Sequence, residues 1–170
     1  MTGFSKAVGA ALLVMVALFG AAFGAARTSG LPWAEDLAAD AAQSAATGAA
    51  ILIFYMSDDC PYCQHVEELY LEPMQQRRPY GDRLLIRVVR ADGHKPVRDF
   101  SGQRTDHATF ARRHGASFTP LIQLYGPDGT ALTSPLVGYT SPDFYAGELE
   151  GRIDDAIGKL RLKNAAAGER

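Results

Sequence analysis

Three continuous apolar runs are spaced along the chain, and most of the segments between them have a helical period. The runs at residues 49–56, 83–89 and 120–126 each suit a strand, and the first two suit strands buried on both faces. Turn residues at 127–130 lead into a fourth strand at 132–138. A helix between early strands implies a parallel unit, and the closing hairpin adds antiparallel strands. The pattern predicts an α/β fold with a central mixed sheet of about four strands flanked by helices.

Two helices are predicted before the second strand. The first covers residues 29–48, and the Ser, Gly and Pro residues at 29–32 mark its start. Its apolar face is formed by Trp33, Leu37, Ala41 and Ala45. The second helix covers residues 61–74, and we expect Pro73 and Pro79 to end it, because proline cannot continue a helix.

The sequence pattern of the second half of the chain predicts a loop and two further helices. Residues 90–104 are polar and have no period, so we expect a surface loop there. A short helix follows at 105–115, with Thr105 as its N-cap. The last helix begins after Ser141, with a proline at its first helical position.

The N-terminus predicts export. Lys6 is followed by the uncharged residues 7–26, whose short apolar core and small C-terminal residues favour a cleaved signal peptide over a retained membrane anchor. Either outcome places the rest of the chain in an oxidising compartment, which we expect to be the periplasm, with membrane contact only through residues 7–26. The expected organisation is a signal peptide or uncleaved anchor (1–26), an N-terminal helix and lead-in (27–48), the main domain (49–162) and a disordered tail (163–170).

Composition narrows the class of protein. The 170 residues are 47% apolar and 21% charged, as in a folded globular protein. The formal net charge is −2, and the Lys and Arg residues are scattered. No basic field indicates nucleic acid as a partner, and no acidic tail indicates a cationic one.

The two cysteines of the chain, Cys60 and Cys63, carry the candidate chemistry. A disulfide between them would close a very small loop, so it would contribute little as a structural crosslink. A structural zinc site needs about four ligands, and none of the four histidines stands at a recognisable spacing from the cysteines. We therefore expect no metal and interpret the cysteines as a reactive pair.

The position of Cys60 favours an ionised thiol. It stands between the first strand and a helix that starts with Pro61, where unpaired backbone N–H groups and the helix dipole stabilise a thiolate. Cys63, one turn later, can reach back to it. We therefore predict that Cys60 attacks a disulfide and that Cys63 resolves the mixed disulfide.

Nearby charges act on the same thiol. Asp58 and Asp59 immediately precede Cys60, and their carboxylates disfavour a second negative charge. His65 offsets them if its ring turns toward the sulfurs; a solvated helix residue is the alternative. We expect a moderate lowering of the Cys60 pKa.

These features together resemble the thioredoxin superfamily over residues 49–160. The motif Cys-Pro-Tyr-Cys follows a buried strand, and Thr119-Pro120 precedes a later one. The resemblance implies that Pro120 is a cis-proline beside the sulfurs and that Thr119 touches the backbone of the substrate. It also implies that substrate contacts Pro61, Tyr62, Val137 and Gly138.

Residues 97–129 resemble bacterial periplasmic thioredoxins, including those found with sulfur-oxidation systems. Two positions depart from thioredoxins themselves: Phe54 stands where they carry a buried aspartate, and Asp59 replaces the tryptophan before the motif. The tetrapeptide is also the glutaredoxin signature, although the region after the cis-proline strand has one glycine where glutaredoxins have two.

The resulting hypothesis is a periplasmic thiol–disulfide oxidoreductase, acting as a reductase on protein clients. It would need no cofactor beyond its redox-active cysteine pair, would take electrons from a membrane donor, and would bind no nucleic acid. The alternatives are a disulfide-forming oxidase, a glutathione-dependent glutaredoxin-like enzyme, and a binding or chaperone module whose cysteines do not turn over.

Overall fold

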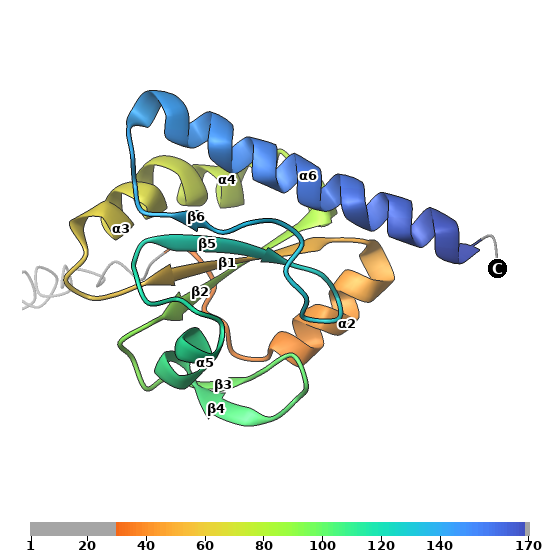
Figure 1. Ribbon diagram of the computed structural model, residues 1–170, viewed down its shortest axis with the longest axis horizontal. Coiled ribbons are helices and arrows are strands. Elements are labelled where there is room, and N and C mark those ends of the chain that lie inside the picture. Colours follow the sequence, from red (N-terminus) through yellow and green to blue (C-terminus); the bar gives the residue numbers. More distant parts are fainter. Residues whose placement is uncertain (1–29, 169–170) are drawn as a thin grey trace, which may run out of the picture.

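A four-stranded mixed sheet forms the centre of the computed structural model, which describes residues 30–168 (Figure 1). Its order is β2-β1-β5-β6, from β1 (Ala50–Met56), β2 (Leu84–Arg90), β5 (Leu121–Tyr125) and β6 (Leu136–Val137). β2 is parallel to β1, whereas β5 is antiparallel to both β1 and β6. The predicted central sheet is confirmed. The predicted signal peptide or anchor at 1–26 lies outside the described residues.

Helices cover both faces of this sheet (Figure 1). One face carries α3 (Pro61–Val66), the π-helical turn η1 (Glu67–Leu71), α4 (Glu72–Arg77) and α6 (Pro142–Gly168). The other carries α2 (Leu37–Thr47) and α5 (His107–Arg113). The short 3-10 helix η2 (Gly81–Arg83) precedes β2.

The side chains of β1 alternate between two hydrophobic cores. Leu52 and Phe54 belong to the core under α3 and α6, whereas Ile53 and Tyr55 belong to the core under α2 and α5. All seven residues of the strand are buried, as expected for a strand between two helical layers. β1 is therefore the rigid element from which the chain enters the cysteine motif.

The first helix starts later than the sequence predicts. The backbone on either side of Trp33 runs beside β2: the Val88 N–H donates to the Pro32 carbonyl at 2.9 Å, and the Ala34 N–H donates to the Val88 carbonyl at 2.9 Å. These bonds satisfy the otherwise open edge of β2. α2 then begins after Asp36, whose carboxylate accepts the Ala39 N–H as an N-cap.

The helix after the cysteine motif continues past Pro73, so the prediction that Pro73 ends it is wrong. The π-helical turn precedes this proline, and the Glu72 N–H there bonds the Glu67 carbonyl. Pro73 is the second residue of α4 and comes directly after this wider turn. The helix ends at Arg78, which has a φ of 48°.

The expected loop at 90–104 contains structure. β3 (Pro96–Arg98) pairs antiparallel with β4 (Arg104–Asp106). Thr105 lies within β4, and the N-cap of α5 is Asp106, whose carboxylate accepts the Thr109 N–H at 2.9 Å. Strands of three residues are too short to show a period, which explains why sequence analysis missed this hairpin.

α6 extends to Gly168, beyond the predicted end of the domain. Lys163 donates to the Asp128 carboxylate at 2.8 Å, and this hydrogen bond lowers the pKa of Asp128. The contact connects the last turns of the helix to the turn after β5. Within residues 30–168 no helix is both long and apolar enough to span a bilayer.

Candidate active site

Cys60 and Cys63 form a disulfide where β1 passes into α3. Cys60 occupies the N-cap position, and its carbonyl accepts the N–H groups of Cys63 at 3.0 Å and Gln64 at 3.3 Å. Pro61 fills the first helical position, where its missing N–H has no cost. The local sequence therefore turns the chain out of the sheet and starts the helix within a few residues.

The two sulfurs differ in accessibility. Cys60 keeps 8% of its surface exposed, whereas Cys63 is fully buried. The Cys63 N–H donates to Cys60 Sγ at 3.2 Å. A backbone donor on this sulfur stabilises negative charge on it, so the geometry suits Cys60 as the attacking thiolate and Cys63 as the buried partner.

Thr119 and Pro120 lie at the same edge of the sheet, joined by a cis peptide bond. β5 is antiparallel to β1, so the start of β5 lies beside the end of β1, with Leu121 opposite Tyr55. The Thr119 and Ser57 hydroxyls are hydrogen-bonded at 2.8 Å. This contact ties the segment before β5 directly to the segment that leads into Cys60.

The pairing of β6 with β5 positions Val137 and Gly138. Val137 lies opposite Leu121, and the Gly138 N–H donates to the Pro120 carbonyl at 2.8 Å. Gly138 has a φ of +77°, a conformation that glycine adopts without strain. The structure thus brings the segments at 57–63, 119–120 and 137–138 together at one edge of the sheet.

Aromatic side chains border this edge, and sequence analysis missed three of the four named here. Tyr62 is 59% exposed, and its ring centroid lies 6.0 Å from that of Tyr139. A hydrogen bond with Tyr139 raises the pKa of Tyr70 to about 12. Phe118, next to Thr119, is 74% exposed. An aromatic residue beside each motif was the available signal, but sequence alone does not show that these side chains face one surface.

The three candidate charged residues have different surroundings. Asp58 forms an ion pair with Arg90, whose Nη1 lies 2.8 Å from Asp58 Oδ1. Asp59 is exposed and pairs with no other residue in the 30–168 range. His65 Nδ1 lies 2.9 Å from the Pro61 carbonyl, and its ring stacks on Tyr139. The ring of His65 is therefore engaged with its own helix and the loop after β6.

Phe54, which stands at the position of the aspartate of thioredoxins, is fully buried in the same core as both cysteines. An apolar ring cannot accept a proton, so this position supplies no base to Cys63. No group of three or more potential metal ligands forms among residues 30–168.

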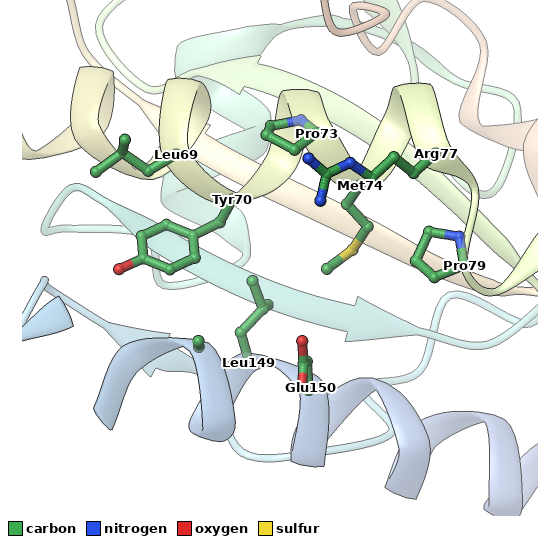
Figure 2. Close-up of a pocket in the computed structure, with 9 residues that line it drawn as sticks. Leu69, Tyr70, Pro73, Met74, Arg77, Pro79, Leu149 and Glu150 are labelled. Atoms are coloured by element: carbon green, nitrogen blue, oxygen red, sulfur yellow. The ribbon is translucent and has the colours of Figure 1, made fainter. Parts of the chain in front are cut away.

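A hollow of about 280 Å³ lies between the α3–α4 helical segment and α6. Figure 2 shows Tyr70 and Met74 on one side of it and Leu149 on the other. None of the predicted site residues lines it. The hollow lies beside the cysteine site and shares Tyr70 with its aromatic border.

The fold and site define a thioredoxin-fold protein with a Cys-x-x-Cys disulfide. A family described as "Thioredoxin-like domain" matches residues 37–152, more than half of the chain, and the chain belongs to that family. The match begins with α2, so the family domain includes the N-terminal helix as well as the central sheet.

A thioredoxin-fold protein from Helicobacter pylori is similar in structure, with 19% sequence identity and a TM-score of 0.49. The similarity covers 67% of this chain and 81% of that one. No curated protein matches the chain. The resemblance to thioredoxins of sulfur-oxidation systems stays a prediction.

Proposed function

We propose that the protein is a thiol–disulfide oxidoreductase that exchanges disulfides with protein clients through Cys60. The observation that carries this proposal is the asymmetry of the pair: Cys60 is the more accessible sulfur and accepts the Cys63 N–H, while Cys63 is buried beneath it. The more accessible thiolate of a pair attacks faster than the fully buried one, and the neighbouring buried thiol then resolves the product.

The exchange in the reducing direction has two steps. The Cys60 thiolate attacks one sulfur of a client disulfide, forming a Cys60–client bond and releasing the other client sulfur as a thiolate. The released client thiolate takes up the proton of Cys63, and the Cys63 thiolate attacks Cys60 Sγ, which forms the Cys60–Cys63 disulfide and releases the second client thiolate. The client gains two electrons, and a dithiol donor must reduce the pair again.

The residues around the sulfurs supply the client surface. The exposed side chains of Tyr62, Val137 and Phe118 border the site, and the Thr119 backbone precedes the cis bond to Pro120. In this proposal an extended client segment lies along these residues, with its disulfide at Cys60. Pro61 and Gly138 leave the backbone near the sulfurs open to that segment.

The setting of the proposal is the periplasm, after export directed by residues 1–26, with a membrane protein as electron donor. The uncharged N-terminal stretch supports this setting. The resemblance of residues 97–129 to thioredoxins of sulfur-oxidation systems makes partners from such a system the first clients to test.

The assignment of the two cysteines is tested with insulin reduction by dithiothreitol. We expect Cys60→Ser to lose all catalysed turnover, because no other thiol is accessible. Cys63→Ser should instead accumulate mixed disulfides with oxidised clients, since the resolving thiol is absent. Non-reducing gels and mass spectrometry measure the adducts.

The double variant Cys60→Ser/Cys63→Ser is the matched control and should form no adduct. Turnover that persists in Cys60→Ser would contradict the proposal. Wild-type protein without any turnover would favour the binding or chaperone alternative.

The direction of exchange is tested separately by equilibration with glutathione buffers. We expect a reduction potential nearer to about −270 mV than to about −120 mV, the values of thioredoxin and of a strong oxidase. Threonine before the cis-proline supports this expectation through the resemblance to reducing and isomerising relatives. A value at the oxidase end would reverse the direction while leaving Cys60 as the attacking group.

A further inference from the structure

The segment before Cys60 carries an apparent electrostatic conflict. Asp58 and Asp59 precede the attacking sulfur within two residues, and an extended backbone covers at most about 7 Å over that separation. This backbone separation is comparable with the Debye length of about 8 Å at physiological ionic strength, so salt screens the carboxylate charges from the sulfur only in part. Unopposed, they would disfavour a Cys60 thiolate.

Arg90 opposes one of these charges directly. Its Nη1 lies 2.8 Å from Asp58 Oδ1 and donates to Oδ2 at 3.0 Å. Asp58 is held by its backbone as well, because its N–H donates to Asp92 Oδ2 at 3.1 Å. β1 and β2 are parallel and end side by side (Figure 1). Their register places Arg90, the last residue of β2, opposite Met56, just before this segment.

Three contacts hold Arg90 in place. Its N–H donates to Nδ1 of the buried His107 at 3.0 Å, and its guanidinium lies 5.4 Å from the ring centroid of Trp33. The next N–H along the chain, that of Ala91, donates to the Met56 carbonyl at 2.7 Å. The backbone at Arg90 is thus held at the end of the sheet, and the partly exposed guanidinium contacts Trp33 and Asp58.

The other groups near the Cys60 sulfur do not replace the positive charge of Arg90. The charged or titratable side chains that border the Cys60 segment, directly or through one contact, are Asp58, Asp59, Tyr62, His65, Arg90, Asp92 and Tyr139. Arg90 is the permanent cation in this set, and the three carboxylates outnumber it. Loss of Arg90 therefore leaves the three carboxylates without a permanent cation beside them.

We propose that Arg90 is a positioning residue that, through its ion pair with Asp58, lets Cys60 ionise at lower pH than the acidic segment would otherwise permit. The inference rests on the proposed function, in which the Cys60 thiolate is the attacking group. It assigns to the end of β2 an electrostatic role that the cysteine motif itself does not contain.

The test follows alkylation of Cys60 by iodoacetamide against pH in the Cys63→Ser background, which leaves one thiol in the chain. We expect Arg90→Gln to move the midpoint of the profile up by about 0.3–1 pH unit, the size of one partly screened charge at this range. Arg90→Lys keeps the charge and should retain most of the wild-type midpoint. Arg83→Gln, before the opposite end of β2, is the matched control and should leave it unchanged.

A double variant separates charge from structure. Arg90→Gln also removes the contact with Trp33, which could disturb the fold. Arg90→Gln/Asp58→Asn loses the same contact but removes the unopposed carboxylate, so its midpoint should return toward that of the wild type. A midpoint that stays raised in the double variant, or does not move in Arg90→Gln, overturns the inference.

The experiments distinguish a failure of this inference from a failure of the proposed function. If wild-type protein reduces insulin but Arg90→Gln leaves the profile unmoved, the role of Arg90 is wrong and the oxidoreductase stands. If wild-type protein shows no Cys60-dependent turnover, the oxidoreductase is wrong whatever the profile shows.

Discussion

His107 begins α5 with none of its side chain exposed. Its Nε2 lies 2.7 Å from the Ala34 carbonyl, while Nδ1 accepts the Arg90 N–H. These partners suit the neutral ring with its proton on Nε2, because protonation of Nδ1 would break the bond from Arg90. One residue thus connects the lead-in before α2, the end of β2 and the start of α5.

Stability should therefore depend on pH through His107. Burial lowers the pKa of His107, and Lys95 and Arg90 lower it further against the opposing effects of Ala34 and Asp106. Above the unfolded value of about 6.5 the ring is neutral in both states and contributes no dependence. As pH falls through that value the unfolded chain takes up a proton first, so the free energy of unfolding decreases until the folded pKa is reached.

Urea denaturation from pH 7.5 to 5 measures this dependence. His107→Gln offers both hydrogen bonds without titrating, so its free energy of unfolding should fall less steeply than that of the wild type. Equal slopes for the two proteins would show that His107 is not buried as a neutral ring.

At the scale of elements, the ends of the helices depend on single side chains and on neighbouring strands. Asp36 and Asp106 cap α2 and α5 through carboxylates that accept backbone N–H groups. Core packing holds α6 through Leu160, since Tyr145, Leu149 and Ile153 lie in the core with the cysteines. Candidate N-cap residues can be identified from a sequence, but each helix start has several of them. Tertiary contacts decide which one caps the helix.

Two leucines on α6 test how far packing stabilises that helix. Leu160 is 2% exposed and belongs to the core, whereas Leu162 on the same helix is 73% exposed. We expect Leu160→Ala to lower the free energy of unfolding by about 2–5 kcal/mol, because it leaves a cavity. Leu162→Ala should change it by no more than about 0.5 kcal/mol. Similar losses in both variants would contradict the packing of α6 on the sheet.

At the scale of the whole molecule, the site is assembled from segments far apart in the chain. β1 delivers Cys60, the antiparallel β5 starts beside it with Pro120, and β6 adds Gly138 by pairing with β5. The parallel β2 ends on the same side and contributes Arg90. Any change in strand order would keep each motif intact and still separate them.

The strands β1, β2 and β5 and the cysteine motif were predictable from sequence because each has a strong local pattern. Buried strands are continuous apolar runs, and Pro61 after Cys60 indicates a helix start. Trp33 was misplaced on a helix because its spacing from Leu37 fits a helical face, while its real partner is the edge of β2. Pairing with a distant strand leaves no periodic signal, so the lead-in and the β3–β4 hairpin were not recognised.

The sequence by itself determined which atoms can react: two thiols three residues apart, at the point where an apolar strand gives way to a helix. Only the tertiary structure decided which sulfur is accessible, which hydroxyl meets Thr119, and which cation faces Asp58. The physical reason is range: hydrophobic periodicity and proline geometry act over a few residues, whereas burial and charge pairing depend on strands brought together from distant parts of the chain.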